Sequence, residues 1–348
     1  MRTMRQTTRM SSHEEISAVT DLVSSWLDRS ARELDETVDS GTRTAVANAL
    51  RTLGERRARG DQNAFYQQQL LLSRIYALGL RLPEKETVEG SVVLAEVTRV
   101  LEEATIEAED ARVPDDLIEE APDEPKAFVS WLKEIARQHR AFKHPYYSEF
   151  IRNDAGFEDI RSYVIQESVI DGRFDDLLAM MQVGTSGGTK MEIARNFWDE
   201  MGNGNDSQVH TSLFNQIFTV FDISAEDFEG ALTAEALLSG NLVLMLCRYR
   251  RFFPEAVGFL GMTEWLVPDR FVNVLHAWER LGLPSYGITY HRLHVTVDAG
   301  HAAGWFRNVV LPHAESPFMR HGMARGAIWR LNSSARHLDE RLQAAGAS

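Results

Sequence analysis

Hydrophobic residues recur at helical spacing along almost the whole chain. The first such pattern follows the stretch Ser12-His-Glu-Glu15, which is typical of a helix N-terminal capping box, and its apolar positions are Ile16, Val19, Leu22, Val23 and Leu27. Further helical patterns cover residues 42–57, 62–80 and 86–108. The first hundred residues therefore predict a small helical bundle with little strand character.

The second half of the chain continues the helical pattern. Alternating apolar and polar residues typical of strands are lacking there, and Gly and Pro separate one helical segment from the next, with Pro268 predicted to end a helix. The predicted helices cover 158–170, 174–181, 191–201, 207–221, 224–239, 242–253, 254–267, 270–281 and 288–310. The fold class is therefore predicted to be all-α.

An acidic segment divides the two helical parts. Residues 102–124 contain eleven acidic residues and one basic residue, Arg112, and prolines stand at 114 and 122. This composition is typical of a solvated, partly extended connector. We therefore expect an N-terminal helical domain over residues 1–122 and a second domain over residues 123–348.

Composition excludes several classes of partner. The formal net charge of the 348-residue chain is −14, so nucleic acid and anionic membranes are not expected to bind its average surface. Cys247 is the only cysteine, which excludes an intramolecular disulfide and any cysteine-rich metal site and suits a reducing cytosol. Because residues 1–10 lack the apolar segment of a signal peptide and no apolar run reaches membrane-spanning length, a cytoplasmic location is expected.

The most informative motif lies in the last predicted helix of this series. His294, Asp298 and His301 are spaced i, i+4 and i+7, so on a helix all three side chains point the same way. Apolar residues surround them. Two imidazoles and a carboxylate on one such face require a neutralising partner, and a metal ion provides one directly.

Four more polar residues lie in or beside helical segments that are predicted to pack in the core. Glu167 lies among Val and Ile residues, and every near neighbour of Glu264 is apolar or small. Glu200 ends a helical segment, and His210 follows it after a Gly- and Asn-rich turn, so both side chains can reach one site from adjoining helices.

Each of these residues also has a simpler interpretation. A single Glu in an apolar helix more often pairs with an Arg, and Asp298 with His301 could be an ordinary hydrogen-bonded pair. The combination of four carboxylates and three imidazoles on four helical regions favours a carboxylate-bridged di-iron site inside a helical bundle.

Other motifs carry weaker signals. The basic cluster Arg248, Arg250 and Arg251 could hold a substrate carboxylate, but a solvated helix face is the simpler interpretation. The glycine-rich segment 184–188 lacks the Lys-Ser/Thr ending of a phosphate-binding loop and does not follow a strand.

Over roughly residues 125–311 these motifs resemble the haem-oxygenase-like di-iron oxidases and oxygenases. The resemblance rests on Gln-Glu167, on Asn-Phe-Trp-Asp-Glu200-Met-Gly-Asn-Gly followed by His210, on Glu264, and on His294-x3-Asp298-x2-His301. It implies a haem-oxygenase-like bundle of about seven core helices with an N-terminal helical extension. It also implies that Glu200 is a candidate ligand bridging the two irons. One iron would be held by Glu167, Glu200, His210 and His301, and the other by Glu264, His294 and Asp298.

Within that family, the Glu200-to-His210 spacing and the additional His294 are most similar to the amine N-oxygenases. The resemblance implies an enzyme of specialised metabolism that uses two Fe2+ ions, O2 and an external electron donor. It would convert a small-molecule amine to a hydroxylamine, nitroso or nitro product through a peroxo-diferric intermediate. In the amine N-oxygenases the N-terminal extension packs in a dimer interface, so a homodimer is implied as well.

Two other functions remain open from the sequence. The same fold could catalyse oxidative C–C cleavage, decarboxylation or desaturation of an amino or fatty acid. A non-catalytic or haem-binding helical bundle is the third possibility. It is disfavoured because a haem protein of this architecture needs one axial His and an apolar slot rather than several inward carboxylates.

Overall fold

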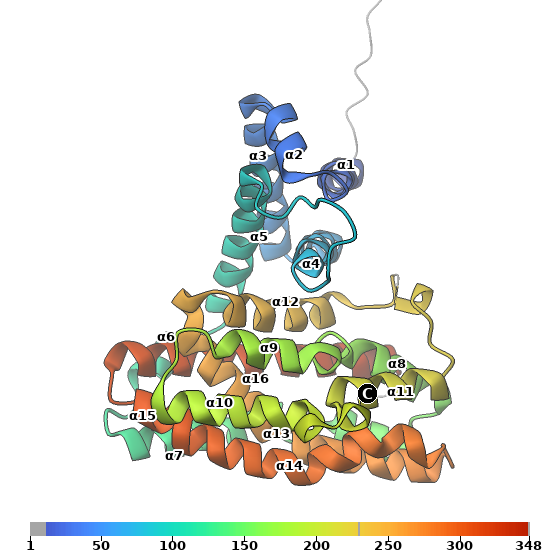
Figure 1. The fold of residues 1–348 in the computed structure, drawn as a ribbon, viewed down its shortest axis with the longest axis vertical. Helices are drawn as coiled ribbons and strands as arrows, with labels where there is room; N and C mark the ends of the chain where they lie inside the picture. The colour runs from blue at the N-terminus through green and yellow to red at the C-terminus, as the bar shows by residue number, and fades with distance from the viewer. Residues whose placement is uncertain (1–11, 229, 347–348) are drawn as a thin grey trace, which may run out of the picture. The chain divides into compact units, whose positions relative to one another are not determined.

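The computed structural model describes residues 12–228 and 230–346, and all regular secondary structure in them is helical (Figure 1). The all-α prediction is therefore confirmed. The expectation that residues 1–10 contain no signal peptide concerns residues outside the described part. No helix in the described residues combines the length and apolar character needed to cross a lipid bilayer.

The chain forms two compact units, and the first ends at Glu109. Helix α4 contacts both α1 and α3 in this unit. Asp39 and Asp61 cap α3 and α4, because their carboxylates accept hydrogen bonds from the backbone N–H groups of Thr42 and Ala64. The helices of the unit are α1 (Ser12–Trp26), α2 (Ala31–Thr37), α3 (Ser40–Ala58), α4 (Gln62–Leu78) and α5 (Val92–Asp110).

The acidic segment is more helical than predicted, and the second unit begins within it, at Asp110. Most of the segment forms the end of α5 and the short helix α6 (Asp115–Glu119). Arg325 forms an ion pair with Asp110 at 2.6 Å, and Asn332 donates a hydrogen bond to the carbonyl of Arg112 at 3.1 Å. These contacts connect Asp110 and Arg112 to α16 (Pro317–Ala344) of the second unit.

The second unit is a bundle whose long central helix is α13 (Phe253–Arg280), which contacts α12, α14 and α16 (Figure 1). Almost every residue of α13 from Pro254 to Leu266 is buried. The other helices of the unit are α7 (Pro125–Gln138), α8 (Phe157–Glu167), α9 (Phe174–Met181), α10 (Gly187–Glu200), α11 (His210–Val220), α12 (Ala234–Arg248), α14 (Thr289–Trp305), α15 (Leu311–His313) and α16 (Pro317–Ala344), with π-helical turns at Tyr146–Asp154 and Phe306–Val310.

Pro268 lies inside α13, so the prediction that it ends a helix is wrong. Proline has no N–H group, and the carbonyl of Glu264, four residues earlier, therefore lacks its usual helical partner. Packing against α14 and α16 on both sides holds the helix together across this defect. The two segments predicted at 254–267 and 270–281 are consequently one helix.

Glycines allow α13 and α16 to approach with their backbones in contact. A Cβ atom on Gly258 would lie 1.9 Å from the carbonyl oxygen of Met323, and one on Gly326 would lie 2.0 Å from that of Glu255. No side chain fits in either place. This close crossing determines how the polar residues of the two helices face one another.

Candidate metal centre

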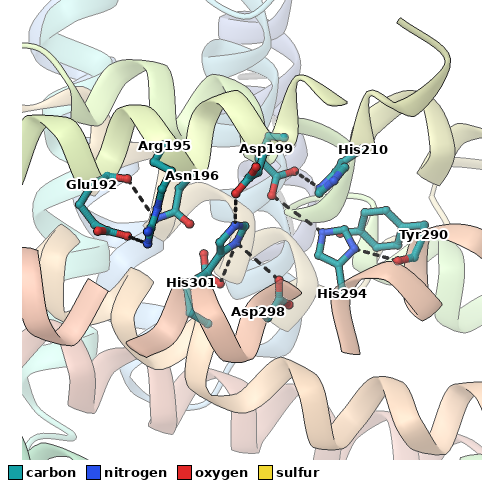
Figure 2. Close-up of polar contacts among 11 residues, drawn as sticks. Glu192, Arg195, Asn196, Asp199, His210, Tyr290, His294, Asp298 and His301 are labelled. Atoms are coloured by element: carbon teal, nitrogen blue, oxygen red, sulfur yellow. Dashed lines mark hydrogen bonds and ion pairs between the residues drawn. The ribbon is translucent and has the colours of Figure 1, made fainter. Parts of the chain in front are cut away.

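Helix α14 carries the motif that the sequence singled out, and its three polar side chains are buried. His294, Asp298 and His301 are each at most 5% exposed. They point toward the ends of α10 and α11 and toward α13 (Figure 2). The stripe therefore faces the interior of the bundle, as its spacing predicted.

The first group of potential ligands consists of Glu200, His210 and His294, one donor atom of each lying within 4.8 Å of the others. Glu200 Oε2 lies 2.8 Å from His210 Nδ1, and Glu200 Oε1 lies 3.9 Å from His294 Nε2. The other ring nitrogen of His294, Nδ1, donates to the backbone carbonyl of Tyr290 at 2.8 Å. This hydrogen bond leaves Nε2 free to face Glu200.

A tight turn brings Glu200 and His210 together. Gly202 has a φ of 59°, and a Cβ there would lie 2.5 Å from the backbone carbon of Gln208. Asn203, at a φ of 53°, continues the turn in the left-handed region that Gly and Asn tolerate best. The turn therefore returns the chain, so that the start of α11 lies beside the end of α10.

The second group consists of Glu264, Asp298 and His301, again with donor atoms within 4.8 Å of one another. His301 Nδ1 lies 3.7 Å from Asp298 Oδ1 and 3.8 Å from Glu264 Oε2. On the other side of the ring, Nε2 donates a hydrogen bond to Asp199 at 3.0 Å (Figure 2). Asp199 thus orients the imidazole with Nδ1 toward the two carboxyl groups.

Several potential metal-ligand atoms in these two groups have no hydrogen-bond partner among the described residues. They are His210 Nδ1, Glu264 Oε1 and His301 Nδ1, all of them buried. His210 Nδ1 is close to Glu200, but the geometry of the contact is not that of a hydrogen bond. Buried polar atoms of this kind are costly unless a ligand satisfies them. Imidazole nitrogens and carboxylate oxygens are suitable ligands for iron, so the residues present fit a metal ion in each group.

The carboxylate of Glu200 is the most strongly stabilised charge in the site. Burial alone would raise its pKa, but the contacts with His210 and His294 lower it to about 2. The charge of Glu200 also acts on Glu264, Asp298 and His301. The charge of Glu200 is therefore felt in both groups, although its close contacts are with His210 and His294.

The second group has the opposite electrostatics. Burial, together with the charge of Glu200, raises the pKa of Glu264 well above its usual value. Burial and the charges of Glu264 and Glu200 do the same for Asp298. Two buried carboxyl groups facing one another cannot both ionise without a cation, and a divalent metal ion would supply the compensating charge.

The structure divides the seven predicted residues differently from the sequence-based assignment. It brings six of them together, but His294 lies with Glu200 and His210, and His301 lies with Glu264 and Asp298. The predicted division had these two histidines the other way round, with His301 beside Glu200 and His294 beside Glu264. Seven residues along a helix correspond to about 10.5 Å, so His294 and His301 reach different ends of the site.

Glu167 belongs to neither group. Its Oε1 lies 3.6 Å from His337 Nε2 and 3.5 Å from the Tyr147 hydroxyl, so its contacts are with α16 and the π-helical turn at Tyr146–Asp154. It is the last residue of α8, where the chain turns into a 3₁₀ segment, Asp171–Arg173. The structure does not bring Glu167 together with the two groups, and its role as a ligand stays a prediction.

Three buried or site-contacting polar residues, Asp199, Arg270 and Arg330, were not predicted from the sequence. Asp199 orients His301 through a hydrogen bond. Its position directly before Glu200 in the sequence was the only feature that could have indicated this role. Arg270 and Arg330 are 5% and 6% exposed. Each stands among apolar residues of a helix, in Arg270-Phe-Val and in Ile-Trp-Arg330-Leu, and this pattern could have indicated a buried charge.

The basic cluster is exposed only in part, because Arg250 is half-buried. Arg248 and Arg251 are exposed, and both guanidinium groups lie over the ring of Tyr249. Arg250 donates to the carbonyl groups of Val183 and Cys247, so it secures the turn before α10. None of the three belongs to the ligand groups.

Comparison with known families supports a redox role for this centre. A family model described as iron-containing redox enzymes matches residues 161–335, half of the chain and all six residues of the two groups. A search of curated proteins found no match.

Proposed function

Because the chain belongs to the family of iron-containing redox enzymes and has the haem-oxygenase-like all-α fold, we propose that it is a non-haem di-iron oxygenase that transfers oxygen to the nitrogen of a small-molecule amine. The observation that carries the proposal is the pair of buried ligand groups, Glu200–His210–His294 and Glu264–Asp298–His301. Iron bound there would supply the activation of O2.

The residues of the chain then have separate tasks. Tyr290 and Asp199 accept hydrogen bonds from His294 and His301 and aim the opposite ring nitrogens at the carboxylates. The six ligand candidates are each at most 5% exposed, so the site is largely shielded from solvent. An amine entering such surroundings loses its proton more readily, because burial disfavours the charged form, and a neutral amine has the lone pair that the reaction needs.

The choice of amine oxygenation rests on two features of the sequence. The ten-residue interval from Glu200 to His210 and the additional His294 resemble the amine N-oxygenases. The position of His294 in a ligand group, rather than beside it, supports its inclusion in the centre. Electrons would come from an external donor.

Iron loading and product analysis test the proposal. The purified chain, reconstituted anaerobically with Fe2+, is expected to bind about two iron ions and to consume O2 when a suitable amine is present. Products heavier than the amine by one or two oxygen atoms, less hydrogen, would support N-oxygenation. Fewer than about one iron per chain would contradict the proposal.

Oxidative C–C cleavage, decarboxylation or desaturation of an amino or fatty acid is the alternative in the same fold. It predicts loss of CO2, loss of a fragment, or loss of two hydrogens, and mass spectrometry of the products separates it from N-oxygenation. A haem protein would show a Soret band.

We also propose that the first unit forms a homodimer. Helices α1 and α3 line an apolar groove of about 440 Å³, and Leu22 at its edge is 40% exposed. A monomeric mass for the wild-type chain in light scattering would contradict this. Leu22→Glu is expected to convert a dimer to a monomer without changing the iron content.

A further inference from the structure

The outward-facing residues of α10 and α14 form one continuous surface. The two helices lie side by side in the second unit (Figure 1). The exposed residues of α10 are two glycines, Lys190, Met191, Arg195 and Trp198. Those of α14 and of the π-helical turn that follows it are four small residues, Arg292 and Arg307. The two rows adjoin, because a Cβ atom on Gly304 would lie 2.4 Å from a guanidinium nitrogen of Arg195. We call these exposed residues the α10–α14 face.

The α10–α14 face carries a charge opposite to that of the whole chain. The formal net charge of the chain is −14, yet the exposed residues of this face include four cations and no carboxylate. Lys190, Arg292 and Arg307 form no ion pair with any described residue. Arg195 pairs with Glu192, whose side chain is only 4% exposed. A basic region on an acidic protein directs an acidic partner to that place.

Two large apolar side chains stand among these charges. Met191 is 70% exposed and Trp198 is 53% exposed. They are seven residues apart, which is about two helical turns, so they point the same way. All seven tryptophans of the chain lie in the described residues, and Trp198 is the exposed one. Large apolar groups surrounded by charge are typical of a surface that binds another protein.

Trp198 is also connected to the candidate metal centre. It directly precedes Asp199, whose carboxylate accepts the hydrogen bond of His301 Nε2 at 3.0 Å (Figure 2). The opposite nitrogen of His301 faces Glu264 and Asp298. One peptide unit and one hydrogen bond therefore link the exposed tryptophan to a ligand candidate of the second group.

The indole ring of Trp198 packs against the turn between α10 and α11. A Cβ atom on Gly204 would lie 3.0 Å from two carbon atoms of this ring, and Gly204 has a φ of 84°, which favours glycine. The glycine therefore leaves room for the ring, whose outer part remains exposed. The ring thus contacts the turn that brings Glu200 and His210 together.

We propose that the α10–α14 face is the docking surface of an acidic one-electron donor protein of the ferredoxin or flavodoxin class. Trp198 and Asp199 form the route by which its electrons reach His301. The route is needed because the six ligand candidates are at most 5% exposed, so a docked donor cannot touch them. Each transfer oxidises the donor by one electron and reduces one ferric ion to ferrous, and no bond forms or breaks. This inference rests on the proposed oxygenase function, for which it supplies the class of the electron donor.

Docking is tested first, on the full metal-free chain. An acidic plant-type [2Fe–2S] ferredoxin and an acidic flavodoxin are titrated by calorimetry, and a basic c-type cytochrome is the oppositely charged control. We expect at least one acidic protein to bind, with an affinity that falls as salt is added, and the cytochrome not to bind. Failure of both acidic proteins to bind, or equal binding of the cytochrome, would overturn the docking surface.

A charge reversal locates the docking. Lys190→Glu is expected to weaken the binding of the acidic protein at least about ten-fold. Lys126→Glu changes an exposed lysine in the first turn of α7, outside this face, and should bind as the wild type does. Equal affinities of the wild type and Lys190→Glu would contradict the proposal. A lower mass of Lys190→Glu alone in light scattering would assign the face to a second copy of the chain instead.

The electron route is tested on the iron-loaded chain at a saturating concentration of the reduced donor. Trp198→Leu is expected to slow the reduction of ferric iron at least about ten-fold, while its iron content stays that of the wild type. Phe157→Leu removes an aromatic ring of α8 that is 42% exposed and should be reduced at the wild-type rate. Dithionite, a small reductant, checks that each variant remains reducible. An unchanged rate in Trp198→Leu would reject the route through this residue.

The two proposals fail in different ways. Donor binding without iron uptake would reject the oxygenase function and the electron route, and it would leave the docking surface standing. Iron uptake and O2 consumption by the Fe2+-loaded chain, without binding of either acidic protein, would leave the function standing and reject the docking surface.

Discussion

Asp199 lies 3.0 Å from Nε2 of His301 and accepts its hydrogen bond, so the opposite nitrogen of the imidazole is directed at Glu264 and Asp298. Asp199 is itself 30% exposed at the side chain. It contacts no other member of the second group, and its influence on a metal ion would act through the orientation of His301.

Asp199→Asn is expected to weaken iron binding in the second group by about 10- to 100-fold, because the carboxylate that fixes the tautomer of His301 is lost. Iron titration of the anaerobic protein measures the change. Asp206→Asn, an exposed substitution in the adjoining turn, is the matched control and should bind iron as the wild type does. An unaltered affinity in Asp199→Asn would show that the hydrogen bond has no role in binding.

The two ligand groups predict separable losses of metal. His210→Ala removes a ligand of the first group only, and Asp298→Ala removes one of the second only. Each variant is expected to retain roughly half of the wild-type iron, about one ion per chain, because the other group keeps its donors. Metal analysis after desalting tests this. Wild-type iron content in Asp298→Ala would remove Asp298 from the centre.

Glu167 offers a direct test of the structure against the sequence-based assignment. Its contacts are His337 and Tyr147, and it lies outside both groups. Glu167→Gln is therefore expected to retain about two iron ions per chain. Loss of one ion in this variant would restore Glu167 to the ligand set that the sequence predicted.

Metal binding should release protons and weaken in acid. The pKa values of Glu264 and Asp298 are raised by burial and by the neighbouring carboxylates, so both groups hold protons in the metal-free fold to higher pH than in the unfolded chain. Since a metal ion binds the ionised forms of Glu264 and Asp298, iron affinity is expected to fall as the pH is lowered, and iron titrations at a series of pH values measure this change.

The same two groups make the metal-free fold less stable as pH rises above their unfolded values, because the folded state then holds more protons than the unfolded state. Asp298→Asn should reduce this dependence. Melting curves of the metal-free wild type and of the variant at several pH values test the sign of this pH dependence of stability. The sign would be reversed if folding lowered the pKa values of the two groups.

Cys247 is expected to be unreactive in the native protein. Its side chain is fully buried, and burial raises the pKa of the thiol to about 12, so thiolate is scarce at neutral pH. A thiol-specific reagent should modify it only after denaturation. Mass spectrometry measures the rate of modification. Rapid modification of the native chain would contradict the burial of this residue.

The amino-acid sequence by itself determined the all-α class, most of the helices and the inward face of α14, because helical periodicity is a local property. Spacing alone placed His294, Asp298 and His301 on one face, and Gly202 and Asn203 marked the turn between Glu200 and His210. Local rules failed where neighbours decided the outcome: α13 continues through Pro268, and the acidic segment is largely helical.

Only the tertiary structure decided which side chains meet. The exchange of His294 and His301 between the groups depends on how α14 lies against α10, α11 and α13, and the separation of Glu167 depends on the turn that follows α8. The pairing of Asp199 with His301 is also a relation between distant segments. Helix formation depends on residues a few positions apart, whereas a charge is paired or unpaired according to what the packing of whole helices brings within a few ångströms.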